Sequence, residues 1–589
     1  MRIIVYSETT AATVGGNLGR PEYSYYFILN KYLPVLSRLG EVIHVEDPLL
    51  EVDTLFDEAA AAGEPSVFLS FTPPHRTASG LRCPTVCVLA WEFDNIPSDD
   101  WDADEPWQNW VMAIREIGHV LTISDYATRV IKRQVGRGPR VETVPAPVDS
   151  VIGVAAEGRD GLPGNVARAR HRTLALKATI FDTQALDIDS ESVTPRAVGA
   201  DGAGAGGHLW DGHAVEWGFS NRSATSGQYL VGFYGEEDWG SWSKTARPSV
   251  IFPWSIVGEV ELSIELVGYG ANQGRTVSIH VGARVVEIVL PATLQVFQLA
   301  VTLDKPVNNL YFTGLTEVPE PGARDHRTLG LGLSSLCLRR PGAEAAATER
   351  PTHAADTDGD AISTVDLAGT VYTSVFNPAD GRKNWFDIVT AFCWAFREQA
   401  DKTLILKMSH HNRSTFLGDL FLMFSRLAPF KCRVIAIHGY LSAQELAELV
   451  TVTDFFVNAS VAEGQCLPLL EFMAEGVPAI SPDHTAMETY IKQDNAFVVA
   501  SSHQPHIWPN DPRESYRTLS NRIDWDSLRQ AYCDSARVLT EEFERYAHMA
   551  AASRLVVEEN YSSEVVEQRL RKFLRNTARP RRWWRPAWL

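Results

Sequence analysis

Two glutamates lie in the segment 458–480 (NASVAEGQCLPLLEFMAEGVPAI) at a spacing that suits ligand binding. Glu463 falls in a loop after a β-rich run. Glu471 falls about one turn inside a helix that should begin near Pro468, since proline suits a first turn. The start of that helix offers unpaired N–H groups and the positive end of the helix dipole, which favour a phosphate. Glutamates eight residues apart also occur as helix caps or solvent-facing pairs, so the spacing alone leaves both interpretations open.

A second group of candidates lies in the segment 376–385 (FNPADGRKNW), after the first strand expected in the second half of the chain. Arg382 and Lys383 could stabilise negative charge that develops on a leaving group. Asn377 lies earlier in the same loop. Basic residues that cap an exposed turn are the alternative. The sequence contains no cluster of metal ligands, and two fixed cations could take the place of a metal ion.

Weaker candidates occur in the first 150 residues. Gly15 and Gly16 follow the first expected strand, and His75 (in FTPPHRT) follows another. Glu92 and Asp94 (in WEFDNIP) also come after a strand. All of these should lie at the edge of a cleft, where they could bind the hydroxyl groups of an acceptor. A simple glycine turn, a loop histidine with its own partner and a helix cap are the alternatives.

Aromatic residues distinguish two further segments. Tyr234, Trp239 and Trp242 stand beside acidic residues in the middle of the chain, and such rings could stack on the C–H faces of sugars. Burial in a β core is the alternative.

The tail 576–589 combines three tryptophans with four arginines and no acidic residue. Because tryptophan favours lipid headgroups and each basic residue gains on the order of 1 kcal/mol near anionic lipid, the tail could contact a membrane surface. Packing of a disordered basic end on the acidic body is the alternative.

The elements that must position these residues form two similar halves. Short apolar runs alternate with helical patterns at 3–6, 42–45, 67–71, 85–91 and 120–124, and again at 371–376, 403–408, 434–438, 455–458, 479–481 and 497–500. Apolar runs without strict alternation indicate parallel sheets that are covered on both faces. The first half should end at 141–149 (VETVPAPVD), where prolines stop regular structure. Doubly wound domains of this kind bind ligands at the carboxyl ends of their strands.

The middle of the chain has a different period. Val260, Leu262, Ile264 and Leu266 alternate with polar residues, and similar alternation continues to about residue 340. Short alternating strands separated by turn residues indicate an antiparallel β-sandwich. The predicted fold is therefore α/β, with two facing Rossmann-like domains and an inserted antiparallel β-sandwich. The expected division is an N-terminal domain at 1–150, an irregular linker at 151–227, the β module at 228–341, a linker at 342–368, a C-terminal domain at 369–540, closing helices at 541–575 and the tail at 576–589.

The motif of the second half resembles that of the retaining glycosyltransferases of family 4, which have two facing Rossmann-like domains (GT-B type). The match consists of Glu463, Gly464, Leu467, Pro468 and Glu471, followed by Gly476, Pro478 and Ile480. The resemblance implies that Glu463 contacts the donor sugar and that Glu471 contacts the ribose of the nucleotide. Backbone amides near Gln465, Cys466 and Leu467 would hold sugar and phosphate oxygens. Gln465 and Cys466 replace the usual Phe-Gly, and Asn377 with Pro378 stands where the family has its arginine, which makes Arg382 the candidate substitute.

Composition limits the class of function. The 54 Lys and Arg against 73 Asp and Glu give a formal net charge of −19, which argues against a general nucleic-acid binder. No apolar stretch is long enough for a transmembrane helix, and the start MRIIVYSE lacks the apolar core of a signal peptide. The seven cysteines form neither an even disulfide framework nor a paired metal motif. We expect a cytoplasmic protein that could attach to the inner face of the membrane through its tail.

The sequence therefore predicts a metal-independent enzyme without a cofactor. It should move a sugar from a nucleotide-sugar to a bacterial surface glycan such as an O-antigen, with a glycan or lipid-linked oligosaccharide as acceptor. A non-catalytic glycan-binding protein, or an epimerase or phosphorylase on the same architecture, is the alternative.

Overall fold

The computed structural model describes residues 1–10, 23–99, 108–152, 172–188, 193–195, 214–220, 230–234, 237–316, 318–319, 327–342, 363–410, 414–509, 511 and 513–577. Gly15 and Gly16, and the tryptophans and arginines of the tail, lie outside these residues.

The N-terminal domain contains a six-stranded parallel sheet in the order β2-β1-β3-β4-β5-β6. Its strands are β1 (Arg2–Tyr6), β2 (Glu41–His44), β3 (Ser66–Ser70), β4 (Thr85–Leu89), β5 (His119–Thr122) and β6 (Arg140–Thr143). The first five match the predicted apolar runs. The sixth corrects the expectation that 141–149 is irregular, because Arg140–Thr143 pairs with β5 before the prolines begin.

Four helices cover this sheet, namely α2 (Ser24–Leu39), α3 (Pro48–Ala61), α4 (Trp110–Ile117) and α5 (Asp125–Val135), together with the short turn η1 (Pro74–Arg76). Side-chain caps fix the starts of three of these helices: Asp47, Asn109 and Ser124 accept hydrogen bonds from the first turn of α3, α4 and α5, respectively. The loops that follow β2, β4 and β5 therefore end at defined points.

The C-terminal domain has a seven-stranded sheet in the order β27-β26-β25-β22-β23-β24-β8. Its strands are β8 (Thr179–Asp182), β22 (Thr370–Phe376), β23 (Lys402–Met408), β24 (Arg433–His438), β25 (Phe455–Val457), β26 (Ala479–Ser481) and β27 (Ala496–Val498). All pair in parallel except the edge strand β8. The order of the parallel strands is that of a dinucleotide-binding Rossmann fold, and it reverses between β22 and β25.

Helices cover both faces of the second sheet. They are α6 (Trp385–Ala395), α7 (Ser414–Leu427), α8 (Ala443–Val452), α9 (Leu467–Ala474) and α10 (Trp525–Glu541), with the short turns η8 (Gly381–Lys383) and η9 (Thr485–Thr489). Residues of α6, α7 and α10 pack in one core cluster, and residues of α8 and α9 pack in another. Between β27 and α10 the chain forms a hairpin, β28 (Ser501–Ile507) and β29 (Tyr516–Ile523), which the sequence analysis did not predict.

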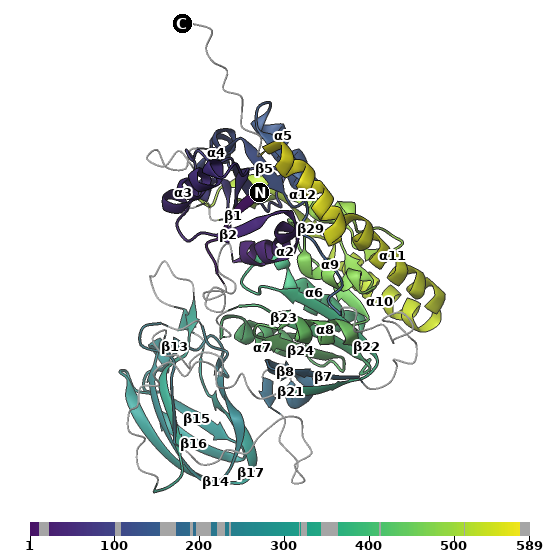
Figure 1. Ribbon diagram of the computed structural model, residues 1–589. Coiled ribbons are helices and arrows are strands. Elements are labelled where there is room, and N and C mark those ends of the chain that lie inside the picture. The colour runs from purple at the N-terminus through teal and green to yellow at the C-terminus, as the bar shows by residue number, and fades with distance from the viewer. Residues whose placement is uncertain are drawn as a thin grey trace, which may run out of the picture.

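Two long helices close the chain. Helix α11 (Phe543–Tyr561) packs against α9 of the C-terminal domain, and α12 (Ser563–Thr577) packs against α2 of the N-terminal domain. Val566, Leu570, Phe573 and Leu574 of α12 are fully buried with the core of the N-terminal sheet. Figure 1 shows these helices in yellow, running from one Rossmann-like domain to the other. The last helix therefore joins the two domains as one body.

The β module is an antiparallel sandwich with a single core, as predicted. Its strands are β11 (Val215–Gly218), β12 (Leu230–Val231), β13 (Ser241–Trp242), β14 (Ser249–Gly268), β15 (Thr276–Val281), β16 (Arg284–Val289), β17 (Gln295–Thr313), β18 (Val318–Pro319), β19 (Thr328–Leu329) and β20 (Leu331–Arg339), with the turn η6 (Gly270–Asn272). The long strands β14 and β17 bend at register shifts between Ile251 and Gly258 and so take part in both layers. Val260, Leu262, Ile264 and Leu266 all face the core.

The predicted linkers contain more structure than expected. Strand β11, inside the predicted linker 151–227, pairs with β20 of the module. Strand β7 (Arg172–Leu176) pairs with β21 (Ser363–Leu367) from the second linker, and β8 extends the C-terminal sheet. The same region also holds β9 (Leu186–Ile188), β10 (Val193–Pro195) and the turn η5 (Thr183–Ala185). These pairings tie the insertion to the edge of the C-terminal domain, where Arg433 and Asp182 form an ion pair.

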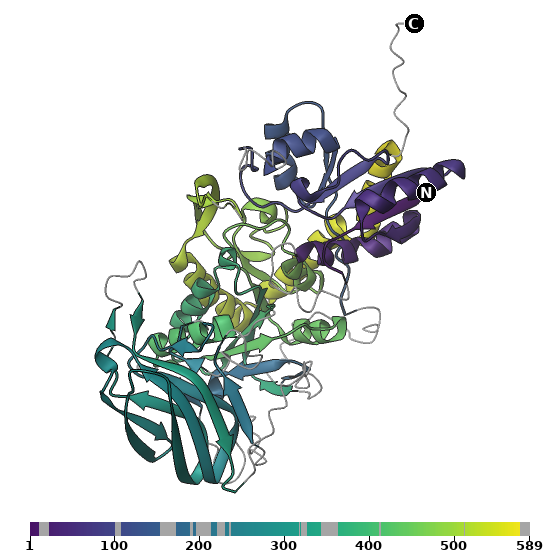
Figure 2. The ribbon, with the colours of Figure 1, turned by 90° about the vertical axis from the view of Figure 1, so that its left-hand side faces the viewer.

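The β module lies against the C-terminal domain, at the end of the molecule opposite the N-terminal domain (Figures 1 and 2). Lys244 of the module bonds Asp419 of α7 at 3.1 Å. Among the described residues, no helix combines the length and the apolar character needed to cross a membrane.

Candidate active site

The carboxyl ends of β22 and β25, where the strand order reverses, carry the main predicted residues. The loop after β22 holds Arg382 and Lys383, and the loop after β25 holds Glu463. Lys383 Nζ donates to Glu463 Oε1 at 2.6 Å. The backbone N–H of Val461 donates to the carbonyl oxygen of Arg382 at 2.9 Å, so the two loops are also joined through their main chains. This is the crevice at which doubly wound domains bind their ligands.

Arg382 lies between carboxylates of both domains. Its Nη2 bonds Asp380 Oδ2 at 2.8 Å, and its Nη1 donates to Glu92 Oε1 of the N-terminal domain. Burial lowers the pKa of the Arg382 guanidinium, but Glu92 and Asp380 outweigh burial and raise it overall. Burial also lowers the pKa of the Lys383 ammonium, but Glu463 and Asp380 together outweigh burial and raise it overall. The surroundings of both groups therefore favour their charged forms.

The charges of this cluster are not balanced. Two cations, Arg382 and Lys383, face three acidic groups, Asp380, Glu92 and Glu463. Burial raises the pKa of the Glu92 carboxyl group, and the neighbouring Asp380 and Glu463 raise it further against the attraction of Arg382. The pKa of Asp380, by contrast, is lowered, because Arg382 and Lys383 outweigh the effect of burial. An anionic ligand that binds here would form ion pairs with Arg382 and Lys383, in competition with these carboxylates.

Helix α9 begins directly behind the cluster. Cys466 precedes it with a left-handed backbone (φ 61°), and Pro468 stands in its first turn as predicted. Glu471, one turn inside, is buried and forms an ion pair with Lys31 of α2 in the N-terminal domain. Each carboxylate of the predicted pair has a lysine partner, and the partner of Glu471 comes from the N-terminal domain.

Gly464 and Gln465 also lie against the N-terminal domain. A Cβ atom on Gly464 would lie 3.5 Å from the backbone nitrogen of Trp91, in ordinary van der Waals contact. The predicted donor contact of Gln465 is through its backbone amide. Its side-chain amide accepts from the backbone N–H of Ala146 at 2.9 Å and donates to the carbonyl oxygen of Ala146 at 2.8 Å. This side chain joins the domains, because both of its amide atoms are occupied by the main chain opposite.

The acceptor-side candidates separate into two groups. Glu92 is the one that reaches the cluster. Asp94 Oδ1 instead accepts hydrogen bonds from Thr518 Oγ1 at 2.8 Å and from the backbone N–H of Leu519 at 2.9 Å, so it anchors the β28–β29 hairpin. Asp94 therefore has a structural contact of its own, and its role in acceptor binding stays a prediction.

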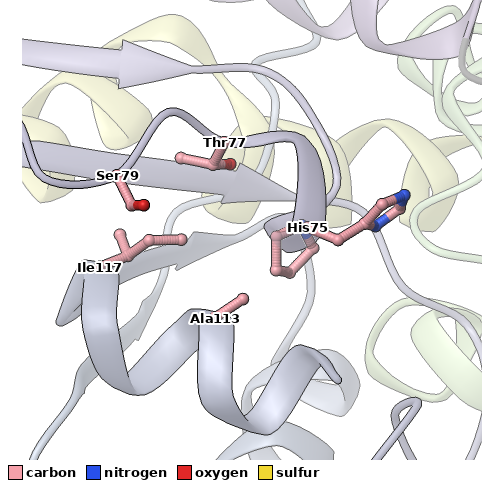
Figure 3. A pocket seen from close by; sticks show the side chains of 6 residues that line it. His75, Thr77, Ser79, Ala113 and Ile117 are labelled. Atoms are coloured by element: carbon pink, nitrogen blue, oxygen red, sulfur yellow. The ribbon is translucent and has the colours of Figure 1, made fainter. Parts of the chain in front are cut away.

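His75 also differs from the expectation. Trp110 Nε1 donates to His75 Nδ1 at 3.0 Å, and the two rings stack at 5.8 Å. A small cavity of about 130 Å³ lies beside this turn, but the ring of His75 points away from Ser79, Ala113 and Ile117, which line it (Figure 3). Trp110 in turn packs on Trp91, next to Glu92. His75 therefore supports the loop that carries Glu92.

Several residues near the cluster were missed by sequence reasoning. Burial raises the pKa of the Tyr23 hydroxyl at the start of α2, and Lys383, Asp380, Arg382 and Glu463 all act on it electrostatically. Burial lowers the pKa of His484, which precedes η9, to about 4, while Glu463 opposes that shift. No sequence signal marks these two residues, because each comes close only through the packing of separate segments.

Lys407 is a third missed residue, at the carboxyl end of β23 beside β22. It is 6% exposed, its Nζ donates to Ser409 Oγ at 2.5 Å, and burial lowers its pKa to about 8. Asn377, predicted to bind the donor, accepts from the backbone N–H of Ala379 at 3.1 Å and so shapes the turn that leads to Arg382.

The three aromatic candidates of the β module gather at one end of the sandwich. The rings of Trp239 and Trp242 meet edge to face at 4.8 Å, and Tyr269 packs on Trp242 at 5.3 Å. Arg327 lies over the ring of Tyr234 at 5.3 Å and pairs with Glu237. All four rings are half-buried, so they belong neither wholly to the core nor wholly to the surface.

Comparison with protein families identifies two segments. Residues 422–508 match the family of group 1 glycosyl transferases. This segment spans β24, α8, β25, α9 and β26, and so includes Glu463 and Glu471. Residues 222–340 match a domain of unknown function (DUF7024), which coincides with most of the β module. No curated protein matches the chain.

Three solved structures that resemble the chain illustrate the low identity of the matches. The pneumococcal O-GlcNAc transferase GtfA, solved with UDP and GlcNAc, is 19% identical over 36% of this chain and 37% of its own, with a TM-score of 0.27. The Anabaena protein Alr3699/HepE, solved with UDP and glucose, is 13% identical over 35% of this chain and 48% of its own, with a TM-score of 0.26. Sucrose-phosphate synthase of Thermosynechococcus elongatus is 10% identical over 98% of both chains, with a TM-score of 0.42.

The alignments span less than half the length of GtfA and of HepE. At these identities and TM-scores, no likeness identifies a substrate or a functional residue of this chain. The class of protein is instead indicated by the fold and by the family match of residues 422–508. Two facing Rossmann-like domains with a returning last helix make the GT-B fold, and the group 1 segment at its crevice supports a glycosyltransferase.

Proposed function

We propose that this protein is a retaining glycosyltransferase that moves a sugar from a nucleotide-sugar to a growing glycan. The observation that carries the proposal is the cluster of Arg382, Lys383 and Glu463 at the point where the strand order of the C-terminal sheet reverses. Ligands of doubly wound folds bind at this point, and fixed cations there suit a diphosphate leaving group.

The proposed roles follow from position and charge. Lys383 and Arg382 stabilise the negative charge on the leaving diphosphate, with no requirement for a metal ion. Glu463 orients hydroxyl groups of the donor sugar, and Glu471 binds the ribose of the nucleotide. The backbone amides at the start of α9 lie next to the phosphates, where the helix dipole favours negative charge.

In the proposed reaction, the bond between the anomeric carbon and the phosphate oxygen breaks, and its electron pair stays on that oxygen. The acceptor hydroxyl attacks the same face of the anomeric carbon, so the configuration is retained. Its proton passes to the leaving phosphate oxygen. The protein then contributes mainly by holding the two substrates together and by stabilising charge. Glu92 of the N-terminal domain, bonded to Arg382, is the acceptor-side residue closest to this chemistry.

We further propose that the acceptor is a glycan or lipid-linked oligosaccharide of a bacterial surface polysaccharide, such as an O-antigen. The basic, tryptophan-rich tail 576–589 would hold a cytoplasmic enzyme at the inner face of the membrane, where such acceptors are found. Half-buried rings at the end of the β module give that module a surface on which a glycan could stack.

The proposal is tested by binding of UDP, GDP, ADP and dTDP and of their sugar conjugates to the full chain, measured by thermal shift. A ligand at 100 times its Kd stabilises a protein by about 2.7 kcal/mol, which raises the melting temperature visibly. We expect one nucleotide class to stabilise the wild type and Lys383→Ala to lose that response.

The matched control is Lys431→Ala, which removes a lysine whose side chain is 65% exposed and which pairs with the surface residue Glu398. This variant should respond to nucleotides as the wild type does. The absence of any nucleotide response in the wild type, or an equal response in Lys383→Ala, would contradict the proposed donor site.

A further inference from the structure

A cavity larger than the one beside His75 adjoins the cluster of Arg382, Lys383 and Glu463. It lies on the face of the C-terminal sheet that α6 and α10 cover. It has a volume of about 690 Å³ and lies between the first turns of α6 and α10 and the base of the β28–β29 hairpin. Its lining includes Asn384, Asp387, Val461, Gln504, Arg522 and Trp525. The volume is within the range of about 300–1,000 Å³ that is usual for small-ligand sites.

The cavity shares its wall with the proposed reaction centre. Asn384 follows Lys383 directly, and Val461 precedes Glu463 by two residues. The backbone of Val461 bonds that of Arg382 on one side and that of Asn521 of the hairpin on the other, both at 2.9 Å. A molecule in the cavity would therefore lie beside the sugar that is held by Glu463.

The residues proposed to hold the nucleotide lie elsewhere. Glu471 and the start of α9 do not line the cavity, and the apolar residues of α9 pack with those of α8 on one face of the sheet. The cavity opens on the α6–α10 face. The donor and the acceptor would thus reach the point where the strand order reverses, between β22 and β25, from opposite faces of the sheet.

The chemistry of the lining favours a neutral, hydroxyl-rich ligand. Asp387 and Asp524 supply carboxylate acceptors, Gln504 and Asn384 supply amides, and Arg522 is the single cation among the lining residues. Asp387 accepts from Asn384 Nδ2 at 2.8 Å, which holds the carboxylate at the cavity edge. Two acids against one base disfavour an anionic ligand such as a phospholipid headgroup.

Aromatic rings continue from the cavity along the surface of α6. Trp525 lines the cavity, and its indole N–H donates to Thr390 Oγ1 at 2.9 Å. Trp394 packs edge to face on Trp525 at 6.2 Å and is 56% exposed, and Phe386 on the same helix is 48% exposed. Large exposed rings next to a polar cavity are the arrangement that binds a chain of sugars, since each ring can cover one apolar sugar face.

We propose that this cavity is the acceptor subsite and that it binds a neutral oligosaccharide, with Trp525 and Trp394 covering successive sugar units. The inference rests on the proposed transferase function and moves the main acceptor contact from the N-terminal domain to the C-terminal one.

The test is saturation-transfer NMR and calorimetry of the full chain with maltotriose, cellotriose, mannotriose and chitotriose. At least one trisaccharide should bind the wild type. Asp387→Asn and Trp394→Ala should each weaken that binding about 10-fold, the effect expected for loss of one hydrogen-bonded or stacking contact. Both changes are on the surface of a helix and leave the core residues of α6 in place. Asp526→Asn, an exposed neighbour that does not line the cavity, is the matched control and should bind as the wild type does.

Nucleotide binding to the same variants separates this inference from the proposed function. Diphosphate affinity should be unchanged in Asp387→Asn and Trp394→Ala, since neither residue contacts Arg382 or Lys383. Retained nucleotide binding with no trisaccharide binding, or with trisaccharide binding that both variants leave intact, would overturn the acceptor subsite alone. Flotation with phosphatidylcholine–phosphatidylglycerol vesicles that Trp394→Ala abolishes, in the absence of trisaccharide binding, would overturn it in favour of a membrane contact.

Discussion

The Lys383 ammonium lies 2.6 Å from Glu463 Oε1, and the two residues come from loops that follow the neighbouring strands β22 and β25. Arg382, next to Lys383, bonds Asp380 of its own loop and Glu92 of the other domain. The cations proposed for the leaving group are therefore shared with carboxylates. A diphosphate must compete with these carboxylates for them, which makes each acid of the cluster a determinant of affinity as well as of catalysis.

The first prediction concerns Glu463→Gln, which keeps the size of the side chain and removes its charge. We expect kcat to fall about 10²–10³-fold, as when one preorganised charged contact to a reacting group is lost. We expect the affinity for the nucleoside diphosphate to stay equal or to rise, because Lys383 loses a competing carboxylate. Initial rates of nucleotide release give kcat, and calorimetry gives the affinity. Glu398→Gln, at an exposed surface position, should change neither. An unchanged kcat would remove Glu463 from the mechanism.

The second prediction concerns Lys31, whose ion pair with Glu471 joins the two domains. If Glu471 binds the ribose, Lys31 competes with the nucleotide for this carboxylate. Lys31→Met should therefore tighten nucleotide binding several-fold. The same change leaves the buried carboxylate of Glu471 without its partner, so it should also destabilise the ligand-free protein, by up to about 3–5 kcal/mol. Lys132→Met on the exposed side of α5 is the control for a lost lysine. Weaker nucleotide binding in Lys31→Met would mean that Lys31 attracts the ligand instead.

Much of the fold could be predicted from the sequence because its strands are fully buried. The apolar runs that became β1, β3, β23 and β24 have no solvent-facing positions, and such runs belong to parallel sheets. The alternation of Val260, Leu262, Ile264 and Leu266 identified the sandwich for the opposite reason, since one face of β14 meets the core and the other does not. In both cases the pattern of apolar residues follows from which faces of a strand are buried, and this is why it predicts the sheets.

The hairpin β28–β29 could not be predicted on these grounds. Its first strand reads SSHQPHI, is mostly exposed and contains Pro505, which argues against a strand in a sequence pattern. Its stability comes from contacts with the N-terminal domain, such as that of Trp508 Nε1 with Asn95 Oδ1 at 2.8 Å. The same reason explains why Tyr23 and Lys31 were missed and why the contacts of the Asp94 and Gln465 side chains with the opposite domain were not foreseen. Each owes its role to packing between domains, which no local pattern encodes.

The third prediction uses the buried Lys407 and its lowered pKa of about 8. Because the folded pKa lies below that of an unfolded lysine, the unfolded state binds more protons between the two values. Stability should therefore rise as pH increases from about 8 to about 10.5, and the charged ammonium should be a net cost at pH 7. Lys407→Met should raise the melting temperature at pH 7, and the difference from wild type should shrink toward pH 10. Lys402→Met is a matched control, since Lys402 lies in the same strand but pairs with Asp401. A gain that does not depend on pH would show that packing, not charge, is responsible.

The fourth prediction separates the structural role of Asp94 from the role in acceptor binding that its sequence position suggested. Asp94→Ala removes the acceptor of two hydrogen bonds, from Thr518 Oγ1 and from the backbone N–H of Leu519. Each donor left unpaired costs about 1–3 kcal/mol, and the cost should fall on opening of the hairpin and not on the whole molecule. Hydrogen exchange measured by mass spectrometry should therefore speed up in peptides from 501–523. Asp94→Asn keeps an acceptor oxygen and should retain most of the protection. Nucleotide affinity should stay within twofold in both variants. Equal exchange in the Ala and Asn variants would contradict the anchoring role, because only one of them loses the acceptor.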